Sequence, residues 1–433
     1  MRIIRTDQAS FENIFQQIKN RGWFNEDIWK QVKIILEDVR KRTEKALFTY
    51  TRKFDKWIPT ADTIEVTSAE MKKAIAEVRA EELAILKLST KRVERFHRKQ
   101  IIKDWFVSDE AGIKLGQRIS PLERVGIYAP GGLAFYPSTV IMAAIPAKIA
   151  GVPEIILVTP AKNGKVNPLI IAAAKLSGVT RIFKIGGAQA IAALANGTNL
   201  VPRVDKIVGP GNAYVTAAKM MVYQWCWCGI DMAAGPSEIL IIADETADAS
   251  YVAADLLAQS EHDEMASAIL LTPHEALARK VASEVTLQLN GLKRKAIASC
   301  ALADFGAIIV TRDMAETTKI ANRFAPEHLE LMVRNPKKIM AEIKHAGAIF
   351  LGHNTPETLG DYMAGPNHIL PTGGTARFSS PLGVYDFVKR SSVLFFSKES
   401  LQKYGKHAAR FADMEGLEAH GKSITVRISP KKP

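Results

Sequence analysis

The chain alternates between short, mostly apolar runs and longer segments whose apolar residues recur with helical spacing. Up to about Gln100 the pattern is rich in Lys and Glu, as in SAEMKKAIAEVRAEELAILKLSTKRVERFHRKQ, and it predicts amphipathic helices. A short polar strand is expected near residues 113–119. The apolar runs that follow are RVGIYAP, EIILVTP, RIFKIGG, DKIVGPG, EILIIAD, SAILLT, AIIVT, HLELMV and AGAIFLG.

These apolar runs indicate the fold class. Each is followed by a segment of helical length, which is typical of parallel strands covered by helices on both faces. The runs form two sets that meet near GIDMAAGPSE, so we expect an α/β protein with two lobes and parallel-rich sheets. From His353 onward the chain is irregular, and so long a structureless stretch is more often functional than a linker. A small helical tail closes the chain.

Length and composition exclude several classes of protein. A chain of 433 residues is expected to form more than one domain. Its apolar runs are broken by Pro, Lys or Gly before the roughly 20 residues that a membrane span requires, and the N-terminus has no signal-peptide pattern. The net charge of +13 comes from Lys and Arg interleaved with acids, which favours a solvated basic surface over a nucleic-acid interface. We therefore expect a cytoplasmic globular protein that binds neither membrane nor nucleic acid.

Glycine-rich turns follow three of the predicted strands: APGG, GGAQ and GPGN. In open α/β sheets, ligands bind beyond the carboxyl ends of the strands, where glycine lets the backbone and helix N-termini approach phosphate. None of the turns matches G-x-G-x-x-G. A nucleotide site and ordinary tight turns are both compatible with them.

Candidate metal ligands lie in three separate segments. Gln259 and His262 are three residues apart in AQSEHDE, on one face if this segment is helical. The irregular stretch adds Asp361 and His368, and the tail adds Glu415 and His420. Two imidazoles, a carboxylate and a neutral oxygen suit zinc, but spacings this wide form no motif and ordinary surface roles are the alternative.

Glu327 and His328 stand side by side after a proline in RFAPEHLELMV. Both side chains can accept protons. The proline favours an irregular backbone in which both side chains can face one pocket, whereas a regular strand would direct them to opposite faces. The alternative is a capping glutamate beside a packed histidine.

Taken in order, the motifs resemble the histidinol dehydrogenase family over about residues 121–427: GIYAPGG, YPSTVIMAAIPAKIAGV, IGGAQAIAALANGT, VDKIVGPGNAYV, GIDMAAGPSEILIIAD, DLLAQSEHDEMA, NRFAPEHLEL, GDYMAGPNHILPTGGTARFSSPLGVYDFVKR and EGLEAHGKSI. The resemblance implies an enzyme that oxidises L-histidinol through L-histidinaldehyde to L-histidine, with two NAD and one zinc ion per subunit. It also implies two incomplete Rossmann-like lobes and a homodimer whose tail crosses to the partner.

On this basis we expect four parts of the chain. They are a helical N-terminal segment, a first Rossmann-like lobe with most catalytic residues, a second such lobe and a tail domain: residues 1–24, 25–128 with 238–382, 129–237 and 383–433.

The resemblance also assigns residues to roles. The zinc ligands would be Gln259, His262, Asp361 and His420. The substrate contacts would be Ser237, Gln259, His262, His328, Asp361, His368, Glu415 and His420, of which Glu415 and His420 would serve the neighbouring subunit's site. The NAD contacts would be Tyr128, Gln189 and Asn212, in or beside the glycine-rich turns.

Two bases fit an oxidation in two stages, because each hydride leaves only as a proton is lost from the oxygen on the same carbon. We expect His328 to accept the alcohol proton in the first stage. Glu327 would then activate a water that hydrates the aldehyde, and His328 would again accept a proton during the second oxidation.

Two segments depart from the family pattern. VYQWCWCGID is longer than usual and carries Trp and Cys residues with no assigned role, and we expect its cysteines to be free thiols. Leu133 and Phe135 stand where smaller residues are common and would narrow the cofactor entrance. A related dehydrogenase of another small alcohol, such as a sulfonated diol, is the alternative within this fold, and a nucleic-acid-binding protein is the alternative outside it.

Overall fold

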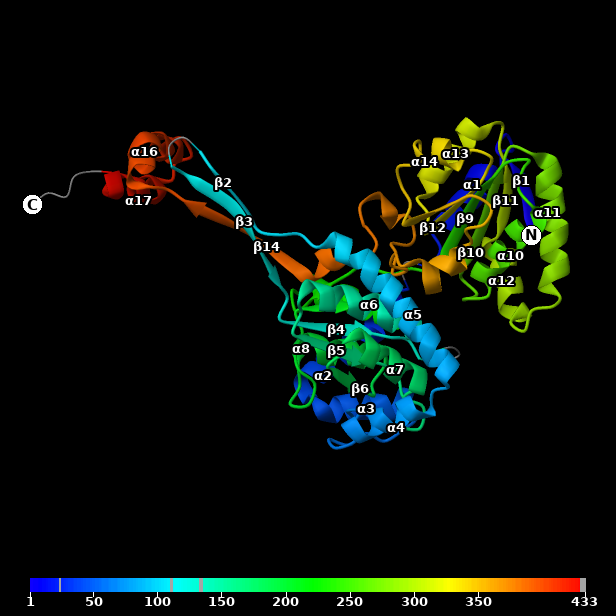
Figure 1. The fold of residues 1–433 in the computed structure, drawn as a ribbon, viewed down its shortest axis with the longest axis horizontal. Coiled ribbons are helices and arrows are strands. Elements are labelled where there is room, and N and C mark those ends of the chain that lie inside the picture. Colours follow the sequence, from blue (N-terminus) through cyan, green and yellow to red (C-terminus); the bar gives the residue numbers. More distant parts are fainter. Residues whose placement is uncertain (23–24, 110–111, 132–134, 429–433) are drawn as a thin grey trace, which may run out of the picture. The chain divides into compact units, whose positions relative to one another are not determined.

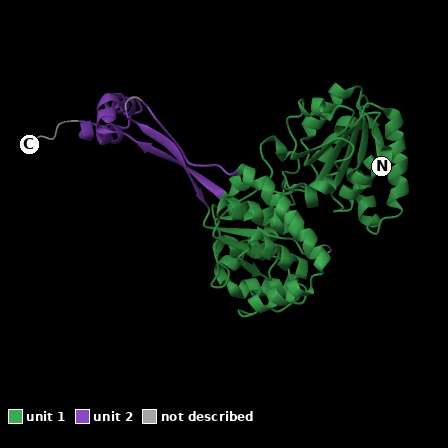
Figure 2. Ribbon diagram, viewed as in Figure 1, with its two compact units in different colours: residues 1–100, 122–387 green, residues 101–121, 388–433 purple. Residues whose placement is uncertain are grey.

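The computed structural model describes residues 1–22, 25–109, 112–131 and 135–428. These residues form two compact units (Figure 2): residues 1–100 with 122–387, and residues 101–121 with 388–433. Two parallel sheets belong to the first unit, and an antiparallel sheet belongs to the second. The predicted α/β class with parallel-rich sheets is confirmed.

Sheet A, in the first unit, has six strands among the described residues, in the order β1-β11-β10-β9-β12-β13, and neighbouring strands pair in parallel. From β9 onward the strands follow the order 3-2-1-4-5 of a Rossmann half. The strand bounds are β1 (Arg2–Arg5), β9 (Glu238–Ala243), β10 (Ser267–Thr272), β11 (Ala307–Val310), β12 (His328–Met332) and β13 (Ala348–Leu351).

Sheet A is apolar on both faces because helices cover both. Ile239 and Ile241 of β9 lie in one core cluster with α10 and α11, whereas Leu240 and Ile242 lie in another with α1 and α13. Figure 1 shows these helices on opposite sides of the sheet. The helices of this lobe are α1 (Phe11–Lys19), α10 (Ala249–Ser260), α11 (Glu275–Leu289), α12 (Lys295–Phe305), α13 (Met314–Phe324) and α14 (Pro336–Met340).

Sheet B, also in the first unit, has the order β6-β5-β4-β7-β8 in the described part of the chain. This is again 3-2-1-4-5, and neighbouring strands pair in parallel. Its strands are β4 (Arg124–Tyr128), β5 (Glu154–Val158), β6 (Arg181–Phe183), β7 (Lys206–Val208) and β8 (Gly229–Ile230).

Helices cover both faces of sheet B as well. One core cluster joins the sheet to α4 through α7, and the other joins it to α2, α3, α8 and α9. The bounds are α2 (Glu26–Arg42), α3 (Glu44–Phe54), α4 (Ser68–Glu77), α5 (Ala80–His97), α6 (Pro137–Ala150), α7 (Pro168–Ser177), α8 (Gly187–Asn196) and α9 (Ala213–Gln224).

The rest of the first unit is the irregular stretch predicted after His353. It contains only short helical turns, namely α15 (Glu357–Leu359), the π-helical turn η2 (Gly360–Ala364), η3 (Thr375–Arg377) and η4 (Val384–Phe387); η1 (Arg98–Gln100) follows α5. The second unit holds β2 (Trp105–Ser108), β3 (Lys114–Pro121), β14 (Val388–Phe395), α16 (Lys398–Met414) and α17 (Glu418–Ile428). No helix in the described ranges is both long and apolar enough to cross a membrane.

Strand pairing corrects the expected boundaries. Residues 25–128 were expected with 238–382, but β4 pairs with β5 and β7 of sheet B, and α2 packs on α8 and α9. The segment 1–24 was expected to be helical; it contains α1, but β1 pairs with β11 and extends sheet A. The tail was expected to begin at residue 383, but it begins at 388 and pairs with residues 114–121. Apolar periodicity identified most strands of the two parallel sheets but could not identify their partners.

The Trp-Cys segment packs within the lobe of sheet B. The rings of Trp225 and Trp227 are 4.7 Å apart, and the Arg40 guanidinium of α2 lies 4.7 Å above the Trp227 ring. Cys226 and Cys228 are free thiols, as predicted, and burial raises the pKa of Cys228 to about 12. Phe135 is exposed, whereas Leu133 lies outside the described residues.

A buried ion pair ties the end of α1 to sheet A. Arg21 lies 3.4 Å from the Glu238 carboxylate at the start of β9, and the two side chains are 2% and 1% exposed. The guanidinium also donates to the carbonyls of Ile18 and Met265 at 2.8 Å and of Ser237 at 3.2 Å. Burial raises the pKa of Glu238, and the charge of Arg21 opposes that rise.

Replacing Arg21 by methionine should lower the free energy of unfolding by about 3–5 kcal/mol, because it leaves a buried carboxylate without its partner. Urea denaturation measures the change. Arg79→Met is the control, since the Arg79–Glu82 pair is on the surface and should contribute less than about 1 kcal/mol. Equal losses in the two variants would contradict the assignment.

In the sequence, His97 lies in an amphipathic segment without other candidate ligands, which predicts a surface or capping role, but the structure places it in the core. It is fully buried, its Nδ1 donates to the Val93 carbonyl at 2.9 Å, and its Nε2 accepts from the Asn367 amide at 3.3 Å. Both nitrogens are satisfied only in the neutral ring, and burial lowers the pKa of His97 below 6.5. The expectation was wrong because residue spacing did not show that the irregular stretch covers α5.

The burial of His97 predicts that the stability of the fold depends on pH. Below about pH 6.5 the unfolded chain binds a proton that the folded chain excludes, so stability should fall as the pH decreases from 7 toward 5. His97→Gln should flatten this dependence in urea midpoints measured across that range. His407→Gln, at an exposed position on α16, should leave the slope unchanged; an unaltered slope in His97→Gln would refute the argument.

Candidate functional site

A strained turn brings Glu327 and His328 to the amino end of β12. Helix α13 ends at Phe324, and its C-cap residue Ala325 has a left-handed backbone with φ 54°, a region that residues other than glycine rarely adopt. Its N–H still donates to the Ala321 carbonyl at 2.9 Å. The close approach of the next strand requires glycine, since a Cβ on Gly347 would lie 2.6 Å from the Glu327 carbonyl oxygen.

His328 is held as a neutral proton acceptor. Its Nδ1 lies 3.0 Å from the Glu238 carbonyl oxygen, which can only accept a hydrogen bond, so Nδ1 carries the proton and Nε2 the lone pair. Nε2 is buried and has no hydrogen-bond partner among the described residues. Burial lowers the pKa of His328 to about 3.

Glu327 lies beside this imidazole. Its Oε2 accepts from the Glu238 N–H at 2.9 Å and is 3.7 Å from His328 Nδ1. Burial raises the pKa of Glu327 well above its ordinary value, and the charges of Glu238 and Asp361 raise it further. The irregular backbone around Pro326 thus places both side chains at one place, as the proline predicted.

Two other segments, residues 259–262 and residues 357–361, meet His328. The donor atoms of His328, Glu357 and Asp361 all lie within 4.8 Å of one another. Gln259, near the end of α10, contacts Glu357, and the charge of Asp361 acts on His262. The structure therefore gathers three of the four predicted zinc ligands, Gln259, His262 and Asp361, into one region of the first unit.

Glu357 was missed in the sequence. It begins α15, is buried, and its Oε1 lies 3.6 Å from His328 Nδ1. Its position four residues before Asp361 is the signal that could have found it, because side chains at this spacing share a face of a helical turn.

The charges in this region fit a cation. Burial is the first cause of the raised pKa of Glu357 and of Asp361, which reaches about 6, and the charges of Asp361 and Glu327 raise that of Glu357 further. No Lys or Arg ion pair to Glu327, Glu357 or Asp361 occurs in the ranges that the structure describes. A divalent cation would reduce this repulsion, and carboxylate, imidazole and amide oxygen are suitable donors for zinc.

His368 connects the irregular stretch to the lobe of sheet B. Its Nδ1 donates to the Asp361 carbonyl at 3.1 Å, and its Nε2 lies 3.5 Å from the Thr139 hydroxyl of α6. Beside it, Asn367 donates to the Met142 carbonyl of α6 at 2.7 Å. These bonds hold the turn that carries Asp361.

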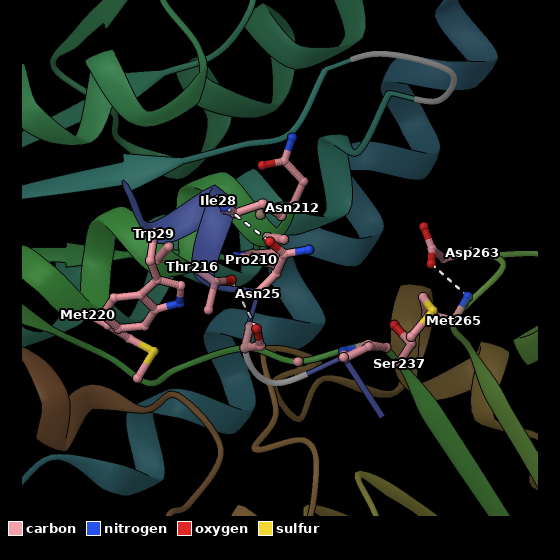
Figure 3. A pocket seen from close by; sticks show the side chains of 17 residues that line it. Asn25, Ile28, Trp29, Pro210, Asn212, Thr216, Met220, Ser237, Asp263 and Met265 are labelled. Atoms are coloured by element: carbon pink, nitrogen blue, oxygen red, sulfur yellow. Dashed lines mark hydrogen bonds between the residues drawn. The ribbon is translucent and has the colours of Figure 1, made fainter. Parts of the chain in front are cut away.

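Two helix N-termini line a cavity of about 430 Å³ (Figure 3). Asn25 caps α2 and Asn212 caps α9, each by accepting two backbone N–H bonds. Ser237, directly before Glu238, lines the same cavity. Helix N-termini favour anionic groups such as a pyrophosphate.

The other predicted cofactor residues lie at a glycine turn. The Tyr128 hydroxyl accepts from the Gly187 N–H at 3.2 Å, and Gln189 is fully buried. Neither polar atom of the Gln189 side chain has a hydrogen-bond partner among the described residues. Tyr128 ends β4, and Gln189 and Asn212 follow β6 and β7. All three therefore lie toward the carboxyl ends of the strands of sheet B, which is the usual binding edge of such sheets.

Glu415 and His420 belong to the second unit. Glu415 caps the end of α16, and His420 lies in α17; both are exposed.

The chain is similar to known proteins over almost its whole length. It matches the family described as Histidinol dehydrogenase over residues 19–428. The histidinol dehydrogenase of Syntrophotalea carbinolica is 52% identical over 429 residues, which cover 99% of each chain. That of Geobacter sulfurreducens is 52% identical over 430 residues, covering 99% of this chain and all of the relative.

A solved structure supports the same relationship. The crystal structure of histidinol dehydrogenase from Elizabethkingia anophelis is 38% identical, has a TM-score of 0.93, and covers 99% of this chain and 98% of its own. Sequence, fold and the gathered motif residues agree, and the chain therefore belongs to the histidinol dehydrogenase family.

Proposed function

We propose that this chain oxidises L-histidinol through L-histidinaldehyde to L-histidine, with two NAD and one zinc ion per subunit. The observation that carries the proposal is the buried, unpartnered Nε2 of His328 beside the Glu327 carboxyl. Family membership supports the substrate, and the geometry supplies two proton acceptors at one place.

His328 is suited to accept hydroxyl protons. Its Nδ1–H is fixed on the Glu238 carbonyl, so the ring presents Nε2 in a constant orientation. In the first oxidation Nε2 accepts the alcohol proton as a hydride leaves the same carbon. After that proton is released, Nε2 accepts a proton from the hydrated aldehyde in the second oxidation.

Glu327 is suited to the hydration between the two oxidations. Its raised pKa makes the carboxylate a stronger proton acceptor, so it can remove a proton from the water that adds to the aldehyde carbon. The Glu238 N–H fixes Oε2, which keeps the carboxylate beside His328.

The metal would be held by Gln259, His262, Asp361 and His420 of the partner subunit. When bound, zinc supplies Lewis-acid activation of the substrate hydroxyl and fixes the substrate in place. His368 and Ser237 would contact the substrate, together with Glu415 of the partner subunit.

NAD, which accepts the hydride in each oxidation, would bind along the carboxyl edge of sheet B. The N-termini of α2 and α9 suit its pyrophosphate. Asn212 would contact it from the cavity. Tyr128 and Gln189 would contact it at the glycine turn, where the unsatisfied Gln189 amide offers both a donor and an acceptor.

A homodimer would bring Glu415 and His420 to the site. The second unit exposes many large apolar side chains, including Trp105, Phe106, Leu394, Phe411 and Met414. Exposed apolar groups this numerous in so small a unit favour burial against another chain.

Replacing Glu327 by glutamine tests the division of labour between the two bases. Histidine formation from L-histidinol should fall by about 10²–10⁴-fold, whereas oxidation of supplied, already hydrated L-histidinaldehyde should continue with His328. NADH formed per substrate consumed is measured, with and without chelator. His328→Asn is the matched control and should impair both oxidations. Equal loss of both by Glu327→Gln would overturn the assignment.

Mixing two inactive variants tests the shared site. His262→Ala and His420→Ala should each abolish activity as homodimers. After joint refolding, about half of the dimers are mixed, and each mixed dimer has both histidines intact in one of its two sites. About a quarter of wild-type activity should therefore return. Size-exclusion chromatography verifies the dimers. No recovery from a mixture that forms mixed dimers would refute the exchange of His420.

A further inference from the structure

Glu357 is a buried acid to which the proposed mechanism gives no step. Its main-chain N–H donates to Glu330 Oε1 at 2.7 Å, which fixes the start of α15 on β12. Glu330 in turn hydrogen-bonds through its carboxyl to Asp255 of α10. The backbone of Glu357 is therefore held by the two elements that carry His328 and Gln259.

The side chain of Glu357 determines how Gln259 is oriented. One terminal atom of the Gln259 amide lies 3.0 Å from both carboxylate oxygens of Glu357. An amide nitrogen carries two hydrogens and can satisfy both oxygens, whereas an amide oxygen would leave at least one contact between two acceptors. The nitrogen therefore faces Glu357, and the amide oxygen is turned away from it.

This orientation matters because a metal ion binds the oxygen of an amide and not its nitrogen. A glutamine side chain is uncharged, and it has no Coulomb attraction to fix it before the ion arrives. Hydrogen bonds from an outer carboxylate are the usual way in which proteins orient a metal ligand. Both carboxylate oxygens of Glu357 already accept hydrogen bonds from the Gln259 amide nitrogen. This carboxylate is therefore less suited to bind the metal itself.

We propose that Glu357 is a positioning residue that turns the oxygen of Gln259 toward the metal. The inference rests on the proposed zinc site. In this role Glu357 is not itself a metal ligand, although its carboxylate oxygens lie close to the donor atoms of His328 and Asp361.

A double-mutant cycle on zinc affinity tests this role. Affinity of the full-length, metal-free protein is measured by competition with a chromophoric chelator, so the readout does not depend on activity. Glu357→Leu should weaken zinc binding by about 10–100-fold. Gln259→Ala should weaken it as well, and adding Glu357→Leu to Gln259→Ala should cause no further loss, because Glu357 acts through Gln259.

The conservative variant Glu357→Gln distinguishes orientation from ligation. Its amide oxygen can still accept a hydrogen from Gln259, so it should keep zinc affinity within about tenfold of wild type. If Glu357 were a ligand, Glu357→Gln and Glu357→Leu would both weaken zinc binding strongly, and Glu357→Leu would weaken it further in the Gln259→Ala background. Either of these two outcomes would overturn the proposal.

Two controls keep the outcomes separate. Thermal unfolding of each metal-free variant identifies one that fails to fold; in that case Glu357→Ala replaces Glu357→Leu in the cycle. If the wild type binds no stoichiometric zinc, the proposed zinc site fails. If the wild type binds zinc and Glu357→Leu binds it equally well, only the role of Glu357 fails.

Discussion

One residue at the start of β9 holds both candidate bases. The N–H of Glu238 donates to Glu327, and its carbonyl accepts from His328 Nδ1. Its side chain pairs with Arg21 and accepts from the Gly373 N–H. The parallel pairing of β9 with β12, in which His328 lies opposite Ile239, makes these bonds possible. The tautomer of the histidine and the position of the glutamate therefore both depend on strand register.

The two sheets share the order 3-2-1-4-5 but bring opposite edges to the candidate site. In sheet B, Tyr128 ends β4 and Asn212 follows β7, at the carboxyl ends of strands where ligands of open α/β sheets usually bind. In sheet A, Glu238, Glu327 and His328 stand at the amino ends. This use of the amino edge depends on the left-handed turn at Ala325, which places Glu327 directly before the ladder and His328 at its first position.

Carboxyl groups, most of them buried, gather in the region around His328. Glu327, Glu330, Glu357 and Asp361 come from two segments of the chain, and burial raises the pKa of each. Such a concentration of acids is costly in a protein interior unless a cation or a shared proton compensates it. The imidazole of His328 is buried beside them, that of His368 is largely buried, and burial lowers their pKa values to about 3 and 4. The arrangement thus places clustered carboxyl groups, which suit a cation, next to imidazoles that remain neutral at pH 7.

The sequence alone predicted most strands of the two parallel sheets, the fold class and the candidate residues of the site. Fully buried strands such as EILIIA can be recognised in the sequence because helices cover both faces of their sheet, and the Glu-His pair can be recognised because the two residues are adjacent. Only the tertiary structure decided which strands pair, so the expected place of β4 in the other lobe was wrong and β1 was not expected as a strand. It alone placed Glu357 against Gln259 and His97 in the core. The physical reason is that apolar periodicity reports which residues are buried, whereas register and contacts between distant segments depend on how all the elements pack together.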